Sequence, residues 1–510
     1  MKKNVLFSFL VAILFIGCSD LEENPEGQLS PDGFVQNVDD LQAVVNGSYS
    51  YLASEEFWGR KYVLAIMLRS DMVDIGDPAT QPPRIQVNNF EMATDNSMVG
   101  TFWPRIYAVI GNANTAIAAA ETLEGEDQNE VNGVVAQARF LRAFGYYHLV
   151  RTFGAVPYLD FAVTEPSQVD GILRTPEEDV YKGIIADLEF AKEWLPDNPA
   201  VRSLPGKGTA AAYLASVYLT TEQWQKSYDE AKFVIDNAGT FNYALEPDFQ
   251  NLFDGDNSVQ PNLKETVFSV DFKGGDQNNA DPGNLSRDYM APITGIRGYE
   301  SAAREGWSVA VPSLAVYDSF DDNDYRKEVS FITEMTDING NFVTFESFGN
   351  YNKGVSRPSI AKYFLKPGAT FSNNARDSDI NYAAMRYAEV LLIAAEALNE
   401  VSGPSAEAYG YINAVRARAR NTPDGVANFP EDLDGLSTEQ FRDAVLEERR
   451  IELAFEYKRW FDQKRRNLWD GFKPGGLEPR PSFVLPKNAL FPLPQNELSI
   501  STSLTQNPGY

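Results

Sequence analysis

The sequence predicts a mainly α-helical protein in which tetratricopeptide-like helical hairpins form a scaffold, with long irregular loops and a few short strands. Two observations carry this prediction. Apolar residues recur at helical spacing over most of the chain. Small residues also alternate with aromatic rings over 208–235, which lets two helices approach closely, although no fixed period repeats along the chain.

The expected helices span 38–53, 103–123, 130–152, 177–195, 207–220, 223–237, 382–400, 405–420 and 437–466. In the helix expected from 382, Tyr387, Leu391 and Leu398 fall on one stripe. The helical pattern stops between 264 and 363. There, residues 266–272 alternate like a strand, and 274–283 read as a loop rich in Gly and Asn.

Charge and composition exclude several classes of protein. The chain has 510 residues, with 44 Lys and Arg against 72 Asp and Glu, and a net charge of −28. A polyanion needs clustered Lys and Arg to displace its counterions, so this balance argues against nucleic-acid binding. The single Cys excludes an intrachain disulfide, and the single His excludes HExxH and multi-His metal sites.

The N-terminus has the features of an export signal. Lys2 and Lys3 precede a largely apolar run, 5–16, that is too short to span a bilayer stably. Residues 14–18, LFIGC, resemble a bacterial lipobox, in which cleavage before the Cys leaves a thiol that carries lipid. We therefore predict lipidation at Cys18 and anchoring to a membrane. An ordinary signal peptide that happens to end in Cys is the alternative.

These features divide the chain into three regions. Residues 1–17 are the predicted signal peptide, 18–30 the lipidated tether, and 31–510 a single folded unit. The unit is expected to consist of an N-terminal helical part (31–263), a loop-rich insertion (264–380), and a C-terminal helical part with a tail (381–510).

Three segments resemble the signatures of the SusD/RagB family, the surface glycan-binding lipoproteins of Bacteroidetes. They read ARFLRAFGYYHLVRTFGAVP over 138–157, RYAEVLLIAAEA over 386–397 and ERRIELAFEYKRWFD over 448–462. The ending FPLPQNEL over 491–498 also fits. The resemblance implies an all-helical scaffold, an irregular part that carries the ligand site, and a SusC-like TonB-dependent outer-membrane transporter as partner.

The same resemblance implies a function. It is non-catalytic capture of an oligosaccharide or polysaccharide outside the cell, with delivery to the transporter, and capture of peptides is the alternative. The acidic stretch 19–23 resembles the signal that displays Bacteroidetes lipoproteins on the outer face of the outer membrane, with a plain linker as the alternative.

Most charged residues of the signatures are expected to be structural, because their spacing suits ion pairs along and between helices. They are Arg139, Arg142, Glu447, Glu448, Arg449, Arg450 and Glu452. Trp103 and Trp460 are expected in the core. His148 lies between Tyr147 and Leu149 on a helix, where a packing or capping role is favoured.

No catalytic constellation stands out. A Ser/His/Asp triad could use only His148, and no GxxxxGK[ST] or GxGxxG loop follows a strand. A glycosidase needs only two carboxylates, but nothing distinguishes a pair. We expect neither enzymatic activity nor a cofactor. A structural calcium is the one exception considered, because Asp254, Asp256 and Glu265 follow EF-hand spacing; Val259 replaces the required Gly, which favours an ordinary acidic turn.

Sugar binding needs exposed aromatic faces for the C–H surfaces of the rings and planar polar groups for the hydroxyls. Trp58 and Trp307 each lie next to Gly in polar surroundings, in the two regions where the family resemblance places ligand contacts. Packing of these rings is the alternative. The candidate ligand-binding residues are Trp307, Trp58, Tyr299, Tyr289, Arg287, Asp77 and Arg84, with Asp74, Gln81 and Asn88 as further polar candidates. The net charge favours a neutral glycan.

Overall fold

The computed structural model describes residues 35–254, 263–272, 287–297, 306–336, 339–351, 356–364 and 380–510. The predicted signal peptide and tether, together with Tyr299 and Asp256, lie outside these residues. Within the described part of the chain, no helix is both long enough and apolar enough to cross a bilayer.

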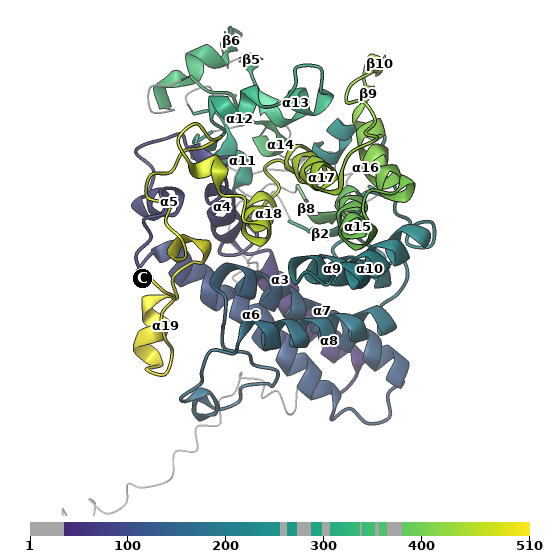
Figure 1. Ribbon diagram of the computed structural model, residues 1–510. Helices are drawn as coiled ribbons and strands as arrows, with labels where there is room; N and C mark the ends of the chain where they lie inside the picture. Colours follow the sequence, from purple (N-terminus) through teal and green to yellow (C-terminus); the bar gives the residue numbers. More distant parts are fainter. Residues whose placement is uncertain are drawn as a thin grey trace, which may run out of the picture.

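The first half of the chain is mainly helical, and its longer helices fill the lower part of Figure 1. The helices are α3 (Val38–Leu52), α4 (Lys61–Leu68), α5 (Pro82–Asn88), α6 (Ser97–Ala120), α7 (Gln128–Phe153), α8 (Glu177–Trp194), α9 (Lys207–Thr220) and α10 (Trp224–Asp236), with short 3-10 turns η2 (Pro166–Val169) and η3 (Phe249–Phe253). Each of α6 to α9 packs against the helix that follows it. The mainly helical fold class is therefore confirmed, while the likeness to tetratricopeptide hairpins stays a prediction.

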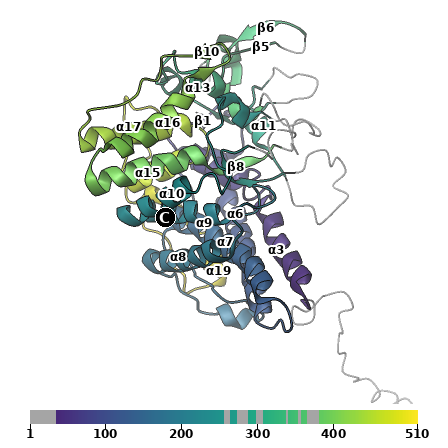
Figure 2. The same ribbon diagram turned by 90° about the vertical axis from the view of Figure 1, so that its right-hand side faces the viewer.

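The helical stack continues across the insertion. Helix α10 packs against α15 (Tyr387–Ser402), which in turn contacts α16 (Ala406–Ala419) and α17 (Thr438–Glu452). Turned by 90°, the molecule shows α15 to α17 on the side away from α3 (Figure 2). Rings of Phe140 and Phe144 on α7 meet Phe268 and Tyr213 at centroid distances of 5.0 to 5.7 Å. These rings join the N-terminal helical part to the start of the insertion.

The insertion begins and ends at a two-stranded sheet. Strand β2 (Thr266–Val270), which confirms the strand expected there, pairs antiparallel with β8 (Tyr382–Arg386). Between them lie, in chain order, α11 (Met290–Thr294), β3 (Ala310–Val311), α12 (Leu314–Asp318), α13 (Tyr325–Ser330), β4 (Phe331–Ile332), β5 (Glu334–Thr336), β6 (Phe342–Thr344), η5 (Phe345–Tyr351), β7 (Ser359–Ile360) and α14 (Ala361–Phe364). Strand β3 pairs with β1 (Asp74–Ile75), β4 with β7, and β5 with β6.

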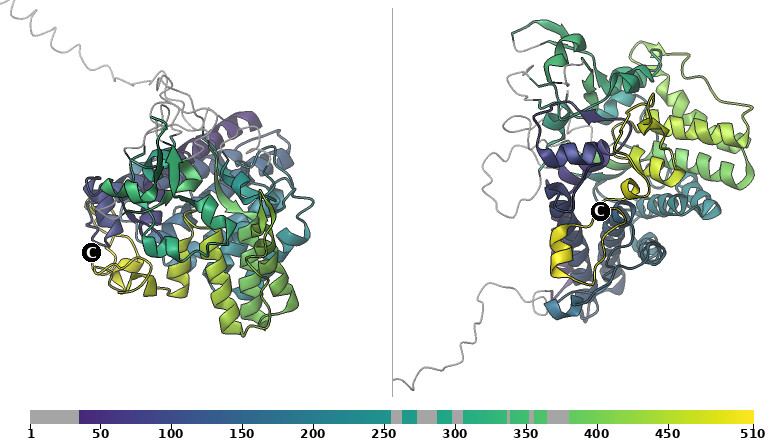
Figure 3. Two further views of the ribbon diagram at one scale, coloured as in Figure 1. Left: turned by 90° about the horizontal axis from the view of Figure 1, so that it is seen from above. Right: turned by 60° about the vertical axis from the view of Figure 1, so that its left-hand side comes forward.

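The remaining elements belong to the C-terminal part: β9 (Asn421–Thr422), β10 (Gly425–Val426), α18 (Arg459–Arg466), η6 (Asp470–Phe472), η7 (Lys487–Ala489) and α19 (Gln495–Ile500). The tail runs back along the N-terminal helices, and α19 lies beside them in Figure 3. Backbone hydrogen bonds fix this return, because the N–H of Phe491 donates to Thr152 and that of Gln495 to Thr94, both at 2.9 Å.

Three expected helices differ from the structure. The one expected from 382 starts as strand β8, because its first residues pair with β2 before α15 begins at Tyr387. The one expected over 437–466 is interrupted after Glu452, since the main-chain carbonyl of Glu452 accepts a hydrogen bond from Arg386 at 3.0 Å. The one expected from 103 begins earlier, where the side chain of Asn96 caps Met98.

Helix α4 was not predicted at all. It spans eight residues, and Tyr62 to Leu68 are all buried. A helix that is apolar all round carries no 3.6-residue alternation, so its sequence gives no periodic signal.

Buried ion pairs join the second and third signature segments. Arg386 Nε lies 2.8 Å from Glu456 Oε2, and its Nη1 lies 2.9 Å from Glu452 Oε1. Burial alone would raise the pKa of Glu452, but the adjacent Arg418, Arg386 and Arg326 hold that pKa well below its usual range. The carboxylate of Glu452 is therefore charged in the core, with three arginines to balance it and its buried neighbours.

Other signature residues have the same role. Their ion pairs are Arg142 with Asp187 (2.7 Å), Arg139 with Asp187 (3.3 Å), Glu448 with Arg416 (2.6 Å), Arg449 with Asp462 (2.9 Å) and Arg450 with Glu447 (2.5 Å). Trp103 and Trp460 are buried at 2% and 0% exposure. The structural interpretation of the signatures is confirmed.

Candidate functional site

Two loops that are far apart in the sequence meet above the helical stack. The main-chain N–H of Arg287 donates to the carbonyl of Ala53 at 3.2 Å, and that of Tyr289 to the carbonyl of Gly59 at 3.0 Å. A Cβ on Gly59 would lie 1.7 Å from the carbonyl oxygen of Arg287, so no larger residue fits there. The early loop and the insertion, which the sequence singled out separately, therefore form one surface.

A second set of contacts joins the same two regions further along the chain. Strand β1 pairs with β3, and the N–H of Asp77 donates to the carbonyl of Ser308 at 2.8 Å. The Asp77 carboxylate also accepts a hydrogen bond from the guanidinium of Arg297. Trp307 is held between these strands and α11, because its N–H donates to the carbonyl of Pro292 at 2.7 Å.

Aromatic and arginine side chains gather where the loops meet. The rings of Tyr289 and Trp307 lie 6.2 Å apart at 43°, and the guanidinium of Arg60 stacks 4.5 Å from the centre of the Tyr289 ring. Both rings are half-buried, as is Arg287. We call Tyr289, Trp307, Arg60, Arg287 and Arg297 the loop cluster. It offers flat apolar faces beside forked hydrogen-bond donors, which is the chemistry that sugar rings and their hydroxyls require.

Asp77 and Arg84 support the loops beneath this cluster. They are 6% and 8% exposed. Asp77 Oδ1 accepts from the N–H of Ala79 at 2.9 Å, and Arg84 Nη1 donates to Thr80 Oγ1 at 3.0 Å. Burial, followed by the nearby charge of Arg60, lowers the pKa of Arg84 to about 10. Of the further polar candidates, Asp74 and Asn88 are also buried, and Asn88 donates to Asp74 at 2.9 Å.

Trp58 is not the exposed platform that its polar surroundings suggested. It is 3% exposed and packs against Phe144, His148 and Tyr457 at centroid distances of 5.8 to 5.9 Å. The neighbouring polar residues face outward instead, as in the salt bridge of Glu56 with Arg105 at 3.4 Å. Arg60 is the residue of this loop that belongs to the loop cluster. In the sequence, the adjacent Gly59 was the feature that pointed to it.

The structure gives Glu265 a role other than that of the calcium ligand considered from the sequence. This carboxylate is fully buried and bonded to Arg386 and Arg418, the latter at 2.6 Å, so its charge is already balanced. Asp254 is half-buried at the end of η3, and Asp256 lies outside the described residues. No group of three His, Cys, Asp or Glu suited to a metal ion occurs in the part of the chain that the structure describes.

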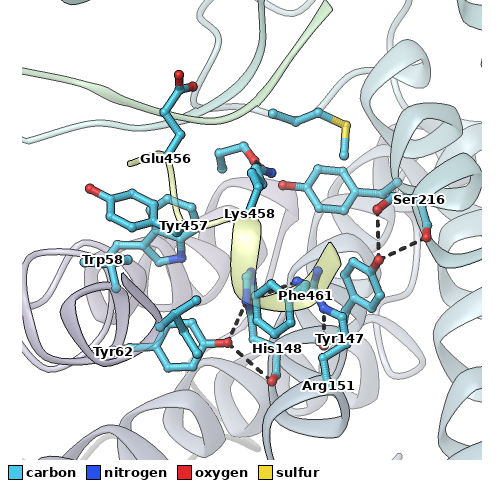
Figure 4. A pocket seen from close by; sticks show the side chains of 15 residues that line it. Trp58, Tyr62, Tyr147, His148, Arg151, Ser216, Glu456, Tyr457, Lys458 and Phe461 are labelled. Atoms are coloured by element: carbon cyan, nitrogen blue, oxygen red, sulfur yellow. Dashed lines mark hydrogen bonds between the residues drawn. The ribbon is translucent and has the colours of Figure 1, made fainter. Parts of the chain in front are cut away.

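Beneath the loop cluster lies a small interior cavity (Figure 4). It is lined by Trp58, Tyr62, His148, Tyr457 and Lys458, among others, and its volume is about 20 Å³. That volume is close to the space needed by one water molecule, so a sugar cannot enter. His148 belongs to this packing, since Tyr62 Oη lies 3.0 Å from its Nδ1. The packing role expected for His148 is confirmed.

The single histidine should make stability depend on pH near neutrality. Burial, followed by the charges of Arg151 and Lys458, holds the pKa of His148 well below its usual value of 6.5. The folded protein keeps this imidazole neutral, whereas the unfolded chain gains a proton below about pH 6.5. The free energy of unfolding should therefore rise between about pH 5.5 and pH 7.5. Denaturant titrations should show that His148→Gln removes most of the rise; a rise of equal size in the variant would contradict this assignment.

The helical scaffold carries two loops that are held together by main-chain hydrogen bonds. These loops present aromatic rings and arginines, which is the architecture of a binding protein. Residues 264–510 match the model of the SusD family, and 38–219 match a model described as "Starch-binding associating with outer membrane". SusD-like protein P2 of Formosa agariphila is 50% identical over 514 residues, which cover 100% of each chain. The chain belongs to the SusD family.

Solved structures have the same fold. A SusD homologue from Bacteroides thetaiotaomicron has a TM-score of 0.81 and 23% identity, and the match covers 94% of this chain and 98% of that one. A laminarin-binding SusD-like protein has a TM-score of 0.78 and 23% identity, with 93% and 100% covered. Neither matching family model is a catalytic one.

Proposed function

We propose that this protein binds an oligosaccharide or polysaccharide at the cell surface without catalysis and delivers it to a SusC-like TonB-dependent outer-membrane transporter. The observation that carries the proposal is the loop cluster, in which Tyr289 and Trp307 lie 6.2 Å apart beside arginine donors. Membership of the SusD family supports it, as does the laminarin-binding protein of the same fold.

The cluster can hold a sugar in a defined way. The C–H faces of a pyranose would lie on the half-buried rings of Trp307 and Tyr289, while forked guanidinium groups such as that of Arg297 donate to its hydroxyl oxygens. Arg60 is already stacked on Tyr289 and therefore helps to orient that ring. These loops are joined by main-chain hydrogen bonds, so little order has to be gained on binding.

Calorimetry against a panel of soluble glycans tests the proposal. The panel contains laminarin, alginate, polygalacturonate and a sulfated galactan, with a mixture of short peptides as the rival ligand. Heat of binding with at least one glycan is expected. Binding to peptides alone would favour the alternative function and overturn the proposal.

The same calorimetry, repeated at several salt concentrations, also tests whether the ligand is neutral or acidic. The net charge of −28 led us to favour a neutral glycan. Within the cluster, Arg60 pairs with Glu55 and Arg297 pairs with Asp77. A neutral ligand should bind almost independently of salt, whereas affinity for an acidic one should fall as salt is added.

Trp307→Ala should weaken glycan binding by about 1–3 kcal/mol, by analogy with the stacking of other flat rings on aromatics. That is roughly a tenfold to hundredfold loss of affinity. Trp194→Ala is a matched control, because Trp194 is also half-buried but lies on α8, where it packs against Phe190. Calorimetry and thermal unfolding of both variants separate the roles. A destabilised Trp307→Ala protein with full affinity would remove Trp307 from the site.

Lipid anchoring and surface display are part of the proposal. If Cys18 carries lipid, Cys18→Ala should convert a membrane-bound protein into a soluble one, because the acyl chains supply the membrane affinity. External protease should digest the wild type on intact cells. Protection until the outer membrane is broken would mean that the protein faces inward.

The transporter partner needs its own test. Cross-linking on intact cells, followed by mass spectrometry of the product, should yield a TonB-dependent transporter with the wild type. Recovery of the uncross-linked protein alone, under conditions where the lipidated protein is at the surface, would contradict a stable partnership.

A further inference from the structure

A groove adjoins the loop cluster but belongs to different elements. It lies between the second half of α3, the loop before α9 and the end of β2, and it has a volume of about 310 Å³. This volume is at the lower end of the range for small-molecule sites. We call it the α3–β2 groove. Its lining includes Asn46, Tyr49, Leu52, Ser203 and Asp271.

The groove has the composition of a sugar site. Leu52 and Val270 contribute apolar surface, and Tyr49 adds a half-buried ring whose hydroxyl donates to Gln137 Oε1 at 3.2 Å, which holds the ring in place. Polar groups lie along its edges. Asn46 is exposed, and Asp271 accepts a hydrogen bond from Ser269 Oγ at 2.7 Å, which leaves its other carboxylate oxygen available for a hydroxyl.

The groove and the loop cluster are connected through a single stretch of backbone. Ala53 lines the groove, and its carbonyl accepts the N–H of Arg287, a member of the cluster. Six residues further on, the carbonyl of Gly59 accepts a hydrogen bond from the N–H of Tyr289. The loop cluster and the groove are therefore neighbours in the described fold, joined at the contact of Ala53 with Arg287.

We infer that the α3–β2 groove is a second subsite for the same glycan chain, so that the protein recognises a stretch of several sugar units rather than a chain end or a single unit. This inference rests on the proposed function, because it requires the ligand to be a glycan. It adds that affinity depends on chain length. Two subsites on one chain act together, since binding at the first raises the local concentration of sugar at the second.

Calorimetry with the panel glycan that the wild type binds most tightly tests the inference. The probes are its disaccharide, hexasaccharide and decasaccharide. The wild type should bind the longest probe at least about tenfold more tightly than the disaccharide. Ser203→Trp, which places a bulky ring in the groove, and Asp271→Ala should both remove most of that gain and leave disaccharide affinity unchanged.

Matched controls make the outcome specific. Ser402→Trp introduces the same ring at an exposed position at the end of α15 and should keep the full gain. Trp307→Ala should weaken binding of every probe. Equal affinity for short and long probes, or a full gain in both groove variants, would overturn the second subsite while leaving the proposed function intact. Absence of heat with every panel glycan would overturn both.

Discussion

Arg386→Met should lower the free energy of unfolding by about 3–5 kcal/mol, the usual effect of removing one partner from a buried ion pair. Arg386 is 2% exposed and bonds three carboxylates, those of Glu265, Glu452 and Glu456. Without it, two arginines and a lysine remain to balance these charges, and Glu452 loses the cation that also holds its main-chain carbonyl. Denaturant titration of the purified variant measures the change.

Lys182→Met is the appropriate control for that variant. Lys182 pairs with Asp179 at 2.7 Å on the surface of α8, with 72% of its side chain exposed. An exposed pair of this kind contributes little to stability, because water and salt screen it. If both substitutions had similar small effects, the signature arginine would not be structural, and a role in ligand binding would have to be reconsidered.

Trp58→Ala should destabilise the protein by about 3–5 kcal/mol, because the substitution leaves a cavity that the surrounding rings cannot shift enough to fill. Trp58 packs between Phe144, His148 and Tyr457, beneath the loop cluster. Loss of thermal stability is therefore expected first, and any loss of glycan affinity should follow from distortion of the loop above. Thermal unfolding and calorimetry on the same sample provide the two measurements.

Trp58→Phe separates these effects. Phe preserves much of the ring contact, so its effect on stability should be clearly smaller than that of Ala. If the Phe variant binds glycan as tightly as the wild type, Trp58 acts only through packing. A tenfold loss of affinity in the Phe variant, with unchanged stability, would instead restore Trp58 to the binding residues.

The helices could be predicted from the sequence wherever one face is polar. The segments at 177–195 and 223–237 fall within one residue of α8 and α10, and each of these helices has an exposed polar face. Periodicity failed for α4, which is buried on all sides, and at β8, where pairing with β2 outweighs a helical pattern. The spacing of apolar residues indicates which face of a helix or strand is exposed to water. It therefore says little about a segment with no exposed face, such as α4.

The candidate site could be predicted only in outline. Both loop regions were identified by aromatic residues next to Gly, and the structure places them together. Trp58 and Trp307 have similar local sequences, yet one is buried and the other half-exposed. Trp58 precedes α4, a buried helix that begins at Lys61 and had no periodic signal in the sequence, so the local pattern did not indicate that Trp58 lies in the core. The α3–β2 groove was missed because its residues come from three distant segments.

The two loops of the site are joined mainly through their backbones, at Gly59 with Tyr289, at Ala53 with Arg287 and along β1 with β3. Main-chain hydrogen bonds form whatever the side chains are, provided that Gly59 is retained. Under the proposed function, the side chains that face the glycan can therefore change during evolution while the backbone contacts persist. Such an arrangement favours rapid divergence of specificity among duplicated copies, and it makes these loops suitable for transplantation between relatives as a unit.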